Sequence, residues 1–453
     1  MSLLTLLSIA RSALLTQQRA MSVSAQNIAN ASTPGYSRQR LNLVAATPLL
    51  TPLGALGRGV ADAGISRVRD RVLDAAYRRE SGLLADATAR QTVLEQVEGA
   101  FGEPSDIGVA ASLDGLFQSF ADLVNDPSNP TSRELVRQAA TRFVQQVHQL
   151  DANLTQVTRD AVVRLQDQVS QANSIAQHLG ELNRQILAAG PGGAPDLEDQ
   201  RDLLVDQLSA LAPVQVQTRA DGTIGVVMDG VTLVDGVQVD QLTVQALPGG
   251  AYSVGTQSGA TGLDLSGGSI GAMTTLLSST LADVRSQLDT FVGTLVSQVN
   301  TLHRQGYTLA GQTQTDFFDP AGVTASTLAL APGILASGDN IAAAGTNAAG
   351  DGANALLLAG LKEDALPALN GRSLRQYYAD IAAGVGIGVR NAGDDVNIHQ
   401  ALLDQADAQR SAVSGVSLDE EMVMLISQQE AYSAAARIVK MADDALQMLL
   451  QIV

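Results

Sequence analysis

The sequence contains no cysteine and no tryptophan, and aromatic residues make up only 3% of its 453 positions. Without cysteine the chain cannot form a disulfide framework, a thiolate catalyst or a cysteine-ligated metal site. An extracellular protein that lacks disulfides must be held together by packing or by assembly alone. We therefore expect a fold that depends on aliphatic packing, supplied mostly by leucine and valine.

Positive charge is also scarce. The formal net charge is −18, and lysine occurs only at Lys362 and Lys440. A nucleic-acid-binding protein normally carries a basic patch or stripe, so we expect no nucleic-acid partner. No run of about 18 uninterrupted apolar residues is present, so we expect neither a transmembrane helix nor a membrane partner. The N-terminal segment has its first charge at Arg11 and lacks a small-residue cleavage site, so we expect no cleaved signal peptide.

The residue types that carry enzyme chemistry do not form a recognisable motif. The four histidines are scattered, and none stands in a His-Glu-x-x-His pattern. They are His148, His178, His303 and His399. Three glycines in residues 384–388 resemble a phosphate-binding loop, but no clear strand precedes them and no lysine follows, so we interpret them as a loop or a helix break. We predict no catalytic, cofactor-binding or metal-binding residues.

An acidic helix at residues 197–211 is the other candidate for chemistry. Its acidic residues recur at helical spacing around Arg201, which favours a solvated helix face over a pair of catalytic carboxylates. They are Glu198, Asp199, Asp202 and Asp206. We interpret this face as exposed.

The strongest pattern lies at the two ends of the chain. Apolar residues alternate steps of four and three in residues 1–28 and again in 418–453, which is the spacing of a coiled-coil seam. We predict that these helices pair with each other and with neighbouring subunits. The proposed contact residues are Leu3, Leu7, Leu14, Met21 and Ile28 at one end, and Met422, Leu425, Tyr432, Val439, Leu446 and Leu450 at the other. Ordinary amphipathic helices on a globular core are the alternative.

The charges of the two ends complement each other. Residues 1–40 contain four arginines and no acidic residue, whereas residues 413–453 contain six acidic and two basic residues. Complementary charge sets the choice and orientation of helical partners more than it adds stability.

Helical periodicity dominates the interior, with one interruption. We predict helices over 70–101, 113–124, 133–188, 197–211, 277–302, 374–381 and 395–413. Residues 36–44 alternate as in a strand, and 45–66 are rich in proline and glycine, which indicates a loop or irregular hairpin. Asp-Gly pairs at 221, 229 and 235 in an alternating stretch predict hairpins. Residues 306–372 predict turns and short helices.

These elements predict a mainly α fold with a small inserted antiparallel β domain. The shape is elongated because the helix at 133–188 is longer than a typical globular helix. We expect three units, two of them discontinuous: a terminal coiled-coil domain at 1–45 plus 413–453, a helical bundle at 46–212 plus 269–412, and the β domain at 213–268.

Residues 24–39 carry a family resemblance. This stretch includes Asn27, Asn30, Thr33, Pro34, Gly35 and Tyr36. The Asn-x-x-Asn…Thr-Pro-Gly-Tyr pattern resembles the N-terminal signature of flagellar axial proteins, and the following Ser-Arg-Gln is similar to the hook-associated protein 1 family. Segments 101–105, 199–202, 303–307, 415–421 and 429–437 agree with that family.

The resemblance implies a structural, non-enzymatic part of the bacterial flagellum. It implies a ring of subunits at the junction between hook and filament, needed for filament assembly and polymerised through the terminal helices. The implied partners are other copies of the chain, the hook protein, a second junction protein, filament proteins and an export chaperone at the C-terminal region. The implied location is extracellular, after flagellar type III export. The chain looks short for the family, which implies a reduced outer region.

Two alternatives remain open. One is another axial protein of the hook or rod type, although hook proteins usually lack the long helices expected at 133–188 and 277–303. The other is a secreted coiled-coil effector or translocator that uses residues 3–15 as an amphipathic membrane anchor.

Overall fold

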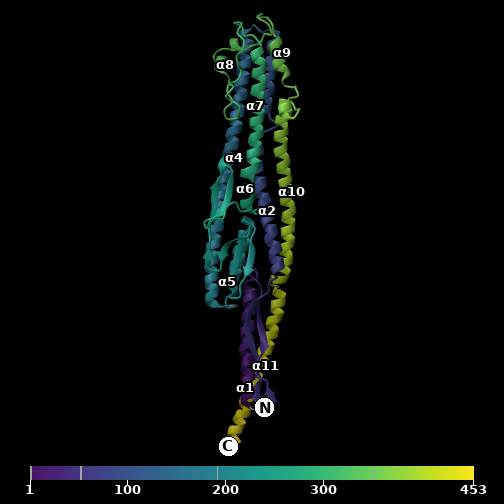
Figure 1. Cartoon of the computed structure of the whole chain (residues 1–453). Coiled ribbons are helices and arrows are strands. Elements are labelled where there is room, and N and C mark those ends of the chain that lie inside the picture. Colours follow the sequence, from purple (N-terminus) through teal and green to yellow (C-terminus); the bar gives the residue numbers. More distant parts are fainter. Residues whose placement is uncertain (1–2, 52–53, 191, 349, 453) are drawn as a thin grey trace.

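The computed structural model describes residues 3–51, 54–190, 192–348 and 350–452, which form an elongated helical molecule (Figure 1). The helices are α1 (Leu3–Ala29), α2 (Arg71–Phe101), α3 (Val109–Asn125), α4 (Pro130–Ala189), α5 (Pro195–Leu211), α6 (Ser269–Thr275), α7 (Leu281–Gln305), α8 (Pro332–Ala336), α9 (Ala353–Gly360), α10 (Leu374–Ser414) and α11 (Leu418–Ile452). The strands are β1 (Gln39–Ala45), β2 (Leu49–Thr51), β3 (Gly54–Leu56), β4 (Val60–Arg67), β5 (Gln215–Thr218), β6 (Ile224–Met228), β7 (Val231–Asp235), β8 (Gln238–Val239), β9 (Leu242–Ala246) and β10 (Tyr252–Thr256).

Helices α2, α4, α7 and α10 form a long bundle, with α2 and α10 packed side by side (Figure 1). The 60-residue α4 begins at Pro130, where proline is favoured because the first helical N–H needs no partner. The Asn129 side chain accepts a hydrogen bond from the Thr131 amide at 2.8 Å and so caps the helix. The apolar stripe of α4 then stays buried along most of its length, which explains how so long a helix remains straight against its neighbours.

An aromatic cluster joins four bundle helices near the last residue of α2 and the first turns of α10. The Phe291 ring lies 6.5 Å from Phe143 and 5.6 Å from Tyr378, measured between ring centroids, and Phe101 lies 6.0 Å from Tyr378. These four rings come from α2, α4, α7 and α10, and each is almost fully buried. Because aromatic pairs at such distances add to the energy of burial, the few aromatic residues of the chain are concentrated where four helices meet.

Buried polar side chains hold the irregular segment 306–352 onto the far end of the bundle. The fully buried Arg133 donates from Nη1 to the Ile341 carbonyl at 2.8 Å and from Nε to the Pro127 carbonyl at 2.6 Å. Asn300 accepts from the Phe317 amide and donates to the Phe318 carbonyl, each at 2.9 Å. These bonds satisfy backbone groups that no helix or strand pairs, so the segment is ordered although its sequence has little periodicity.

The inserted β unit confirms the hairpin prediction. Strands β5 to β8 form an antiparallel sheet in sequence order, and β9 pairs with β10. Asp229 and Gly230 both have positive φ, as a two-residue hairpin turn requires. Two asparagines of α4 bind the unit to the bundle: Asn183 donates to the Ile224 and Gly236 carbonyls at 3.0 and 2.7 Å, and Asn173 accepts from the Leu242 amide at 2.7 Å.

Strands β1 and β4 form one antiparallel hairpin that includes the shorter pair β2 and β3, so residues 45–66 are an irregular hairpin and not an open loop. The register shifts between Leu41 and Leu43, which marks a bulge. Helix α1 contacts both β1 and β4.

The expected break at residues 384–388 is wrong. Helix α10 runs without interruption from Leu374 to Ser414, and the two helices predicted at 374–381 and 395–413 are parts of it. Glycines here face α2: Gly388 lies beside Leu94, and Gly386 beside the Glu98 side chain. Packing between long helices therefore outweighs the loss of about 1 kcal/mol of helix propensity at each glycine.

The two termini lie at the same end of the molecule, where α1 and α11 pack side by side (Figure 1). The mainly helical fold, the small antiparallel β insert and the paired terminal helices are thus confirmed.

The buried side chain of His303 makes the free energy of unfolding depend on pH. Its Nδ1–H donates to the Thr315 carbonyl at 2.7 Å, and its Nε2 accepts from the Ala342 amide at 2.9 Å. Burial lowers the pKa of this imidazole to about 4. Between pH 6.5 and 4 the unfolded chain binds a proton here that the native chain does not, so stability falls as pH falls.

We expect the contribution of His303 to the free energy of unfolding to drop by about 2 kcal/mol between pH 7 and pH 5. Urea unfolding of the wild type and of His303→Asn at both pH values would measure it, because the variant lacks this proton site. The same change at the exposed His148 of α4 is the control. An identical pH dependence in wild type and His303→Asn would contradict the prediction.

Candidate assembly interface

The end of α1 is tied to β1 by the side chain of Asn27. Its Oδ1 accepts hydrogen bonds from the Gln39 amide at 2.9 Å and the Tyr36 hydroxyl at 2.8 Å, and its Nδ2 donates to the Gln39 carbonyl at 2.9 Å. Asn27 is 1% exposed. The side chain therefore acts as a strand partner for Gln39 and reverses the chain after α1, which explains the asparagine and tyrosine of the sequence signature.

The turn between Asn27 and Gln39 uses the remaining signature residues. The Thr33 amide donates to the Asn30 carbonyl at 2.9 Å, and the Tyr36 amide donates to the Thr33 carbonyl at 3.2 Å. Gly35 has a φ of +80°, and a Cβ built there would lie 3.3 Å from the Leu203 Cβ. Glycine is therefore needed both for the left-handed backbone and for close contact with α5. The neighbouring Pro34 is exposed.

Acidic side chains of α5 accept hydrogen bonds from the residues at the end of this turn. The Asp199 carboxylate accepts from the Ser37 amide at 3.0 Å and from the Ser37 hydroxyl at 2.6 Å. Asp196 accepts from the Gln39 side chain at 2.7 Å. The turn is thus fixed to the bundle by carboxylates, and burial together with these carboxylates raises the pKa of the Tyr36 phenol.

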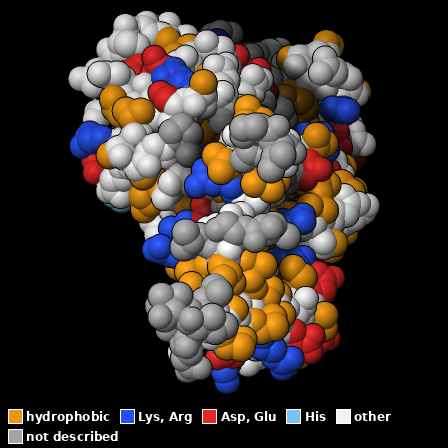
Figure 2. Space-filling view, turned by 90° about the horizontal axis from the view of Figure 1, so that it is seen from below, with side chains coloured by type: hydrophobic (Ala, Val, Ile, Leu, Met, Phe, Trp, Pro, Cys, Tyr) orange, Lys and Arg blue, Asp and Glu red, His pale blue; other side chains and the backbone are white. Residues whose placement is uncertain are grey.

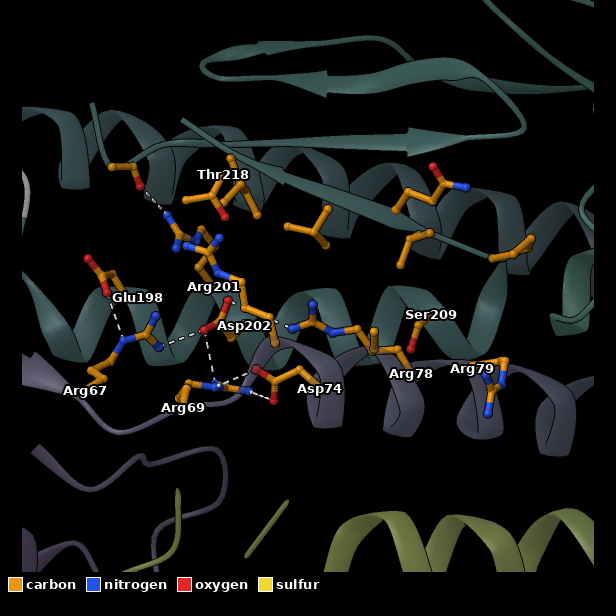
Figure 3. A pocket seen from close by; sticks show the side chains of 18 of the residues that line it. Arg67, Arg69, Asp74, Arg78, Arg79, Glu198, Arg201, Asp202, Ser209 and Thr218 are labelled. Carbon is orange, nitrogen blue, oxygen red and sulfur yellow. Dashed lines mark hydrogen bonds and ion pairs between the residues drawn. The ribbon is translucent and has the colours of Figure 1, made fainter. Parts of the chain in front are cut away.

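Asp199 and its helix neighbour Asp202 pair with arginines from the end of the β1–β4 hairpin, and Figure 3 shows the pairs of Asp202. Arg67 donates from Nη1 to Asp199 at 2.8 Å and to Asp202 at 2.7 Å, and Arg69 donates to Asp202 at 3.1 Å. Burial alone would raise the pKa of the Asp202 carboxyl, but Arg67, Arg69 and the nearby Arg201 more than offset it, so the pKa lies below its usual range.

The prediction of a solvated acidic face on α5 is therefore wrong. Asp199 and Asp202 are buried, at 5% and 9% exposure. Their helical spacing is that of an exposed face, and the sequence gives no direct sign of the arginines that cover them. The only available signal was the clustering of three arginines in residues 67–71, at the end of the hairpin that precedes α2.

A second ionic contact joins the signature segment to α11. Arg38 donates from Nε to Glu421 and from Nη1 to Glu420, each at 2.8 Å, and its backbone amide donates to the Ser414 carbonyl at 2.9 Å. Glu421 is 2% exposed, whereas Glu420 remains largely in solvent. The opposite charges of the chain ends therefore meet in one subunit at the point where α10 gives way to α11.

The contact between α1 and α11 is made mostly by small residues. The buried residues of α1 include Ala10, Thr16, Ala20, Val23 and Ser24, and those of α11 are Glu421, Ala435 and Ala442. Short side chains permit helices to approach closely. The larger residues of each four-three pattern are half-buried or exposed where their side chains are described.

The residues proposed for subunit contacts fall into two groups. Leu3, Leu7, Leu14, Met21, Ile28, Leu425, Val439 and Leu446 are half-buried, whereas Met422 and Tyr432 are exposed. The side chain of Leu450 lies outside the part of the chain that the structure describes. Contact between these residues and a neighbouring subunit stays a prediction.

One face of α11 carries large apolar side chains in solvent. Met422, Val423, Ile426, Met441 and Met448 are all more than half exposed. By the 3.6-residue repeat, Ile426 lies opposite the buried Ala435, whereas Met441 points to the side, about 100° from the buried Ala442. Figure 2 shows hydrophobic side chains gathered at this end of the molecule.

A groove of about 770 Å³ runs between α1, β1 and α11, lined by residues such as Ala20, Leu41 and Met424. Among the described residues, no group of three histidine or acidic side chains is placed to hold a metal ion. The helices of the described part of the chain include none with the length and hydropathy to span a membrane.

Three flagellar families match this chain. Residues 94–318 match the "Flagellar hook-associated protein FlgK helical domain", residues 396–452 the "Flagellar basal body rod FlgEFG protein C-terminal" family, and residues 7–36 the "Flagella basal body rod protein" family. The two rod matches fall on the terminal helices, and the helical-domain match falls on the bundle and the β insert.

Individual relatives agree. Flagellar hook-associated protein 1 of Bacillus subtilis is 31% identical over 97% of this chain and 96% of its own length. The proteins of that name from Salmonella typhimurium and Escherichia coli are 29% and 28% identical over 69% of this chain, which spans only 59% and 60% of their lengths. The flagellar hook junction protein FlgK from Burkholderia pseudomallei has a similar fold, with a TM-score of 0.67 at 17% identity over 76% of this chain and all of that one.

The fold and the matched terminal helices define a structural component of the bacterial flagellum. Within that class, the chain belongs to the flagellar hook-associated protein 1 family.

From the contacts of Asp199, we predict that its carboxylate fixes the segment after α1 to the bundle. Asp199→Ala removes the acceptor of two Ser37 donors and one partner of Arg67, which we expect to cost about 3 kcal/mol of stability. Hydrogen exchange of the amides of residues 37–44 would measure the loss as faster exchange. Asp160→Ala, at an exposed acid of α4 that accepts only from Gln156, is the matched control. Equal protection in the two variants would show that the carboxylate does not anchor this segment.

Proposed function

We propose that this chain links the hook to the filament of the bacterial flagellum, and that copies of it assemble into a ring through their terminal helices. The observation that carries the proposal is the exposed apolar face of α11, formed by Met422, Val423, Ile426, Met441 and Met448. These residues form two groups, at 422–426 and 441–448, and large apolar side chains gathered on the surface of a protein mark a site of interaction. One α1 helix covers only one side of α11, so a neighbouring subunit supplies the partner for the other side.

The arrangement of the chain supports a ring with the terminal helices inside. Both termini lie at one end, while the bundle and the β insert extend away from them (Figure 1). A head-to-tail contact repeated around an axis closes into a ring when its rotation allows. We infer three functional units: the terminal helices at 1–45 plus 413–453, the bundle at 46–212 plus 269–412, and the outer β unit at 213–268.

The proposed partners follow from the position of such a ring. One side contacts the hook protein, and the other contacts a second junction protein and then filament proteins. Export proceeds through the flagellar type III apparatus without a cleaved signal peptide, with a chaperone bound near the C-terminus, and places the chain outside the cell. The chain acts mechanically and not as an enzyme; membership of a structural flagellar family supports this inference.

Experiments can distinguish the junction role from two rival functions. A hook or rod protein would be needed for the hook itself, so its loss would remove hooks as well as filaments. A secreted translocator that inserts residues 3–15 into a membrane would bind liposomes and leave flagella normal. The end-to-end match to a hook-associated relative favours the junction over both.

We expect Ile426→Glu and Met441→Glu each to prevent filament attachment. Each change places a charge on the exposed apolar face, where burial in an interface would cost several kcal/mol, yet it leaves the α1 contact intact. In flagellated cells that carry the variant as their only copy, electron microscopy should show hooks without filaments, and blotting should find filament protein in the medium.

Leu357→Glu is the matched control. Leu357 is 54% exposed on α9, at the opposite end of the molecule from α11 (Figure 1). We expect normal filaments from this variant, and circular dichroism of all three purified variants should match the wild type. Normal filaments with both α11 variants would contradict assembly through this face.

A further inference from the structure

A cavity of about 910 Å³ lies between the start of α2, helix α5 and strand β5 of the β unit (Figure 3). No residue of α1 or α11 lines it, although Arg67, Arg69 and Asp202 belong both to its wall and to the contact described above. Its volume falls within the range of small-molecule sites, which extends to about 1,000 Å³.

The charge of this cavity opposes that of the whole chain. Six arginines and three acidic residues line it among the described residues, although the chain has a net charge of −18. Four of these arginines form ion pairs within the protein: Arg67, Arg69, Arg78 and Arg79. The remaining two, Arg71 and Arg201, form no ion pair with any described residue.

Arg201 is the more informative of the two because it is buried. The residue is 4% exposed, and its Nη1 donates to the Gly222 carbonyl at 2.8 Å. Its Nε is buried without a hydrogen-bond partner, and its Nη2 donates to no described residue. Because Nε is enclosed by the protein, Nη2 is the donor that can reach a carboxylate or phosphate oxygen in the cavity.

A buried guanidinium without a counter-ion is costly. Removal of a charge from water costs several kcal/mol unless an opposite charge and hydrogen bonds compensate. Burial accordingly lowers the pKa of Arg201, in spite of the nearby Asp202 and Glu198. Those two carboxylates are engaged instead by Arg67. Arg201 therefore lacks a counter-ion within the described chain, and an anion from outside the chain would supply one.

We propose that this cavity is a binding site for a small soluble oxyanion that bears carboxylate or phosphate groups, held by Arg201 with Arg71 as a second, exposed contact. A singly charged inorganic ion would fill little of the volume, so a multivalent or organic anion fits better. Such a ligand would join the β unit to α2 and α5 through charge. The proposal does not rest on the junction role, although Arg67, Arg69 and Asp202 also belong to the contact that holds the segment after α1.

Isothermal titration calorimetry of the full chain with inorganic phosphate and with citrate tests the proposal, with sodium chloride of matched ionic strength as the blank. We expect saturable one-site binding to the wild type. Arg201→Gln should weaken it by about tenfold or more, the loss of one charged, hydrogen-bonded contact. Arg71→Gln, at an exposed position whose loss cannot disturb folding through a buried pair, should weaken it several-fold.

Arg184→Gln removes one positive charge from an exposed pair on α4 and is the control for net charge. The proposal is overturned if neither anion binds saturably, or if Arg71→Gln and Arg201→Gln bind as the wild type does. If Arg201→Gln does not fold, Arg71→Gln decides alone.

Sedimentation with and without phosphate separates the two possible sources of an oxyanion. A monomer that binds phosphate supports a soluble ligand. A dimer that phosphate or Arg201→Gln disperses would mean that an acidic side chain of a second copy occupies the cavity, and it would overturn the assignment to a soluble ligand.

Discussion

The rest of this structure depends on the contact between the buried carboxylates of α5 and the segments that follow α1 and β4. Asp199 and Asp202 receive the turn after α1 and the arginines at the end of the β1–β4 hairpin. Without them, the segment after α1 would keep only weaker contacts with α5, such as the hydrogen bond from the Gln39 side chain to Asp196 and the packing of Gly35 against Leu203. A charged contact suits this place because it specifies one orientation, whereas an apolar contact between small residues would permit sliding. The account of assembly requires such a fixed orientation, since each subunit must present α11 to its neighbour at the same angle.

The terminal helices illustrate how much the sequence could predict. The four-three spacing correctly indicated two long helices that pack together, because that spacing follows from helix geometry alone. The spacing did not indicate which face of α1 packs against α11, or which face of α11 packs against α1. The predicted stripe consists mostly of large residues, but the most buried residues of the two helices include the small Ala20, Ala435 and Ala442. Alanine is common on every side of these helices, so its role is visible only once the partner is in place.

Two other expectations failed for a related reason. Residues 384–388 were expected to break a helix because glycine is a poor helix former, yet tertiary contact with α2 keeps the helix intact. The acidic residues of α5 were expected to face solvent because carboxylates usually do, yet arginines more than 100 residues away in the sequence pair with them. Local propensity and periodicity gave the elements of the fold correctly, whereas contacts over a long distance in the sequence decided the burial of the candidate site.

The absence of cysteine permits a direct test of contact between copies through the outer face of α11. We would combine Leu15→Cys in α1 with Ile426→Cys or, for comparison, with Leu357→Cys in α9, and treat isolated flagella with a bifunctional maleimide. The account predicts cross-linked species larger than one chain for the pair at 15 and 426, since Leu15 is an exposed apolar residue of α1. It predicts no such species for the pair at 15 and 357. Failure of the 426 and 15 pair to cross-link, in flagella that contain the variant chain, would contradict assembly through the terminal helices.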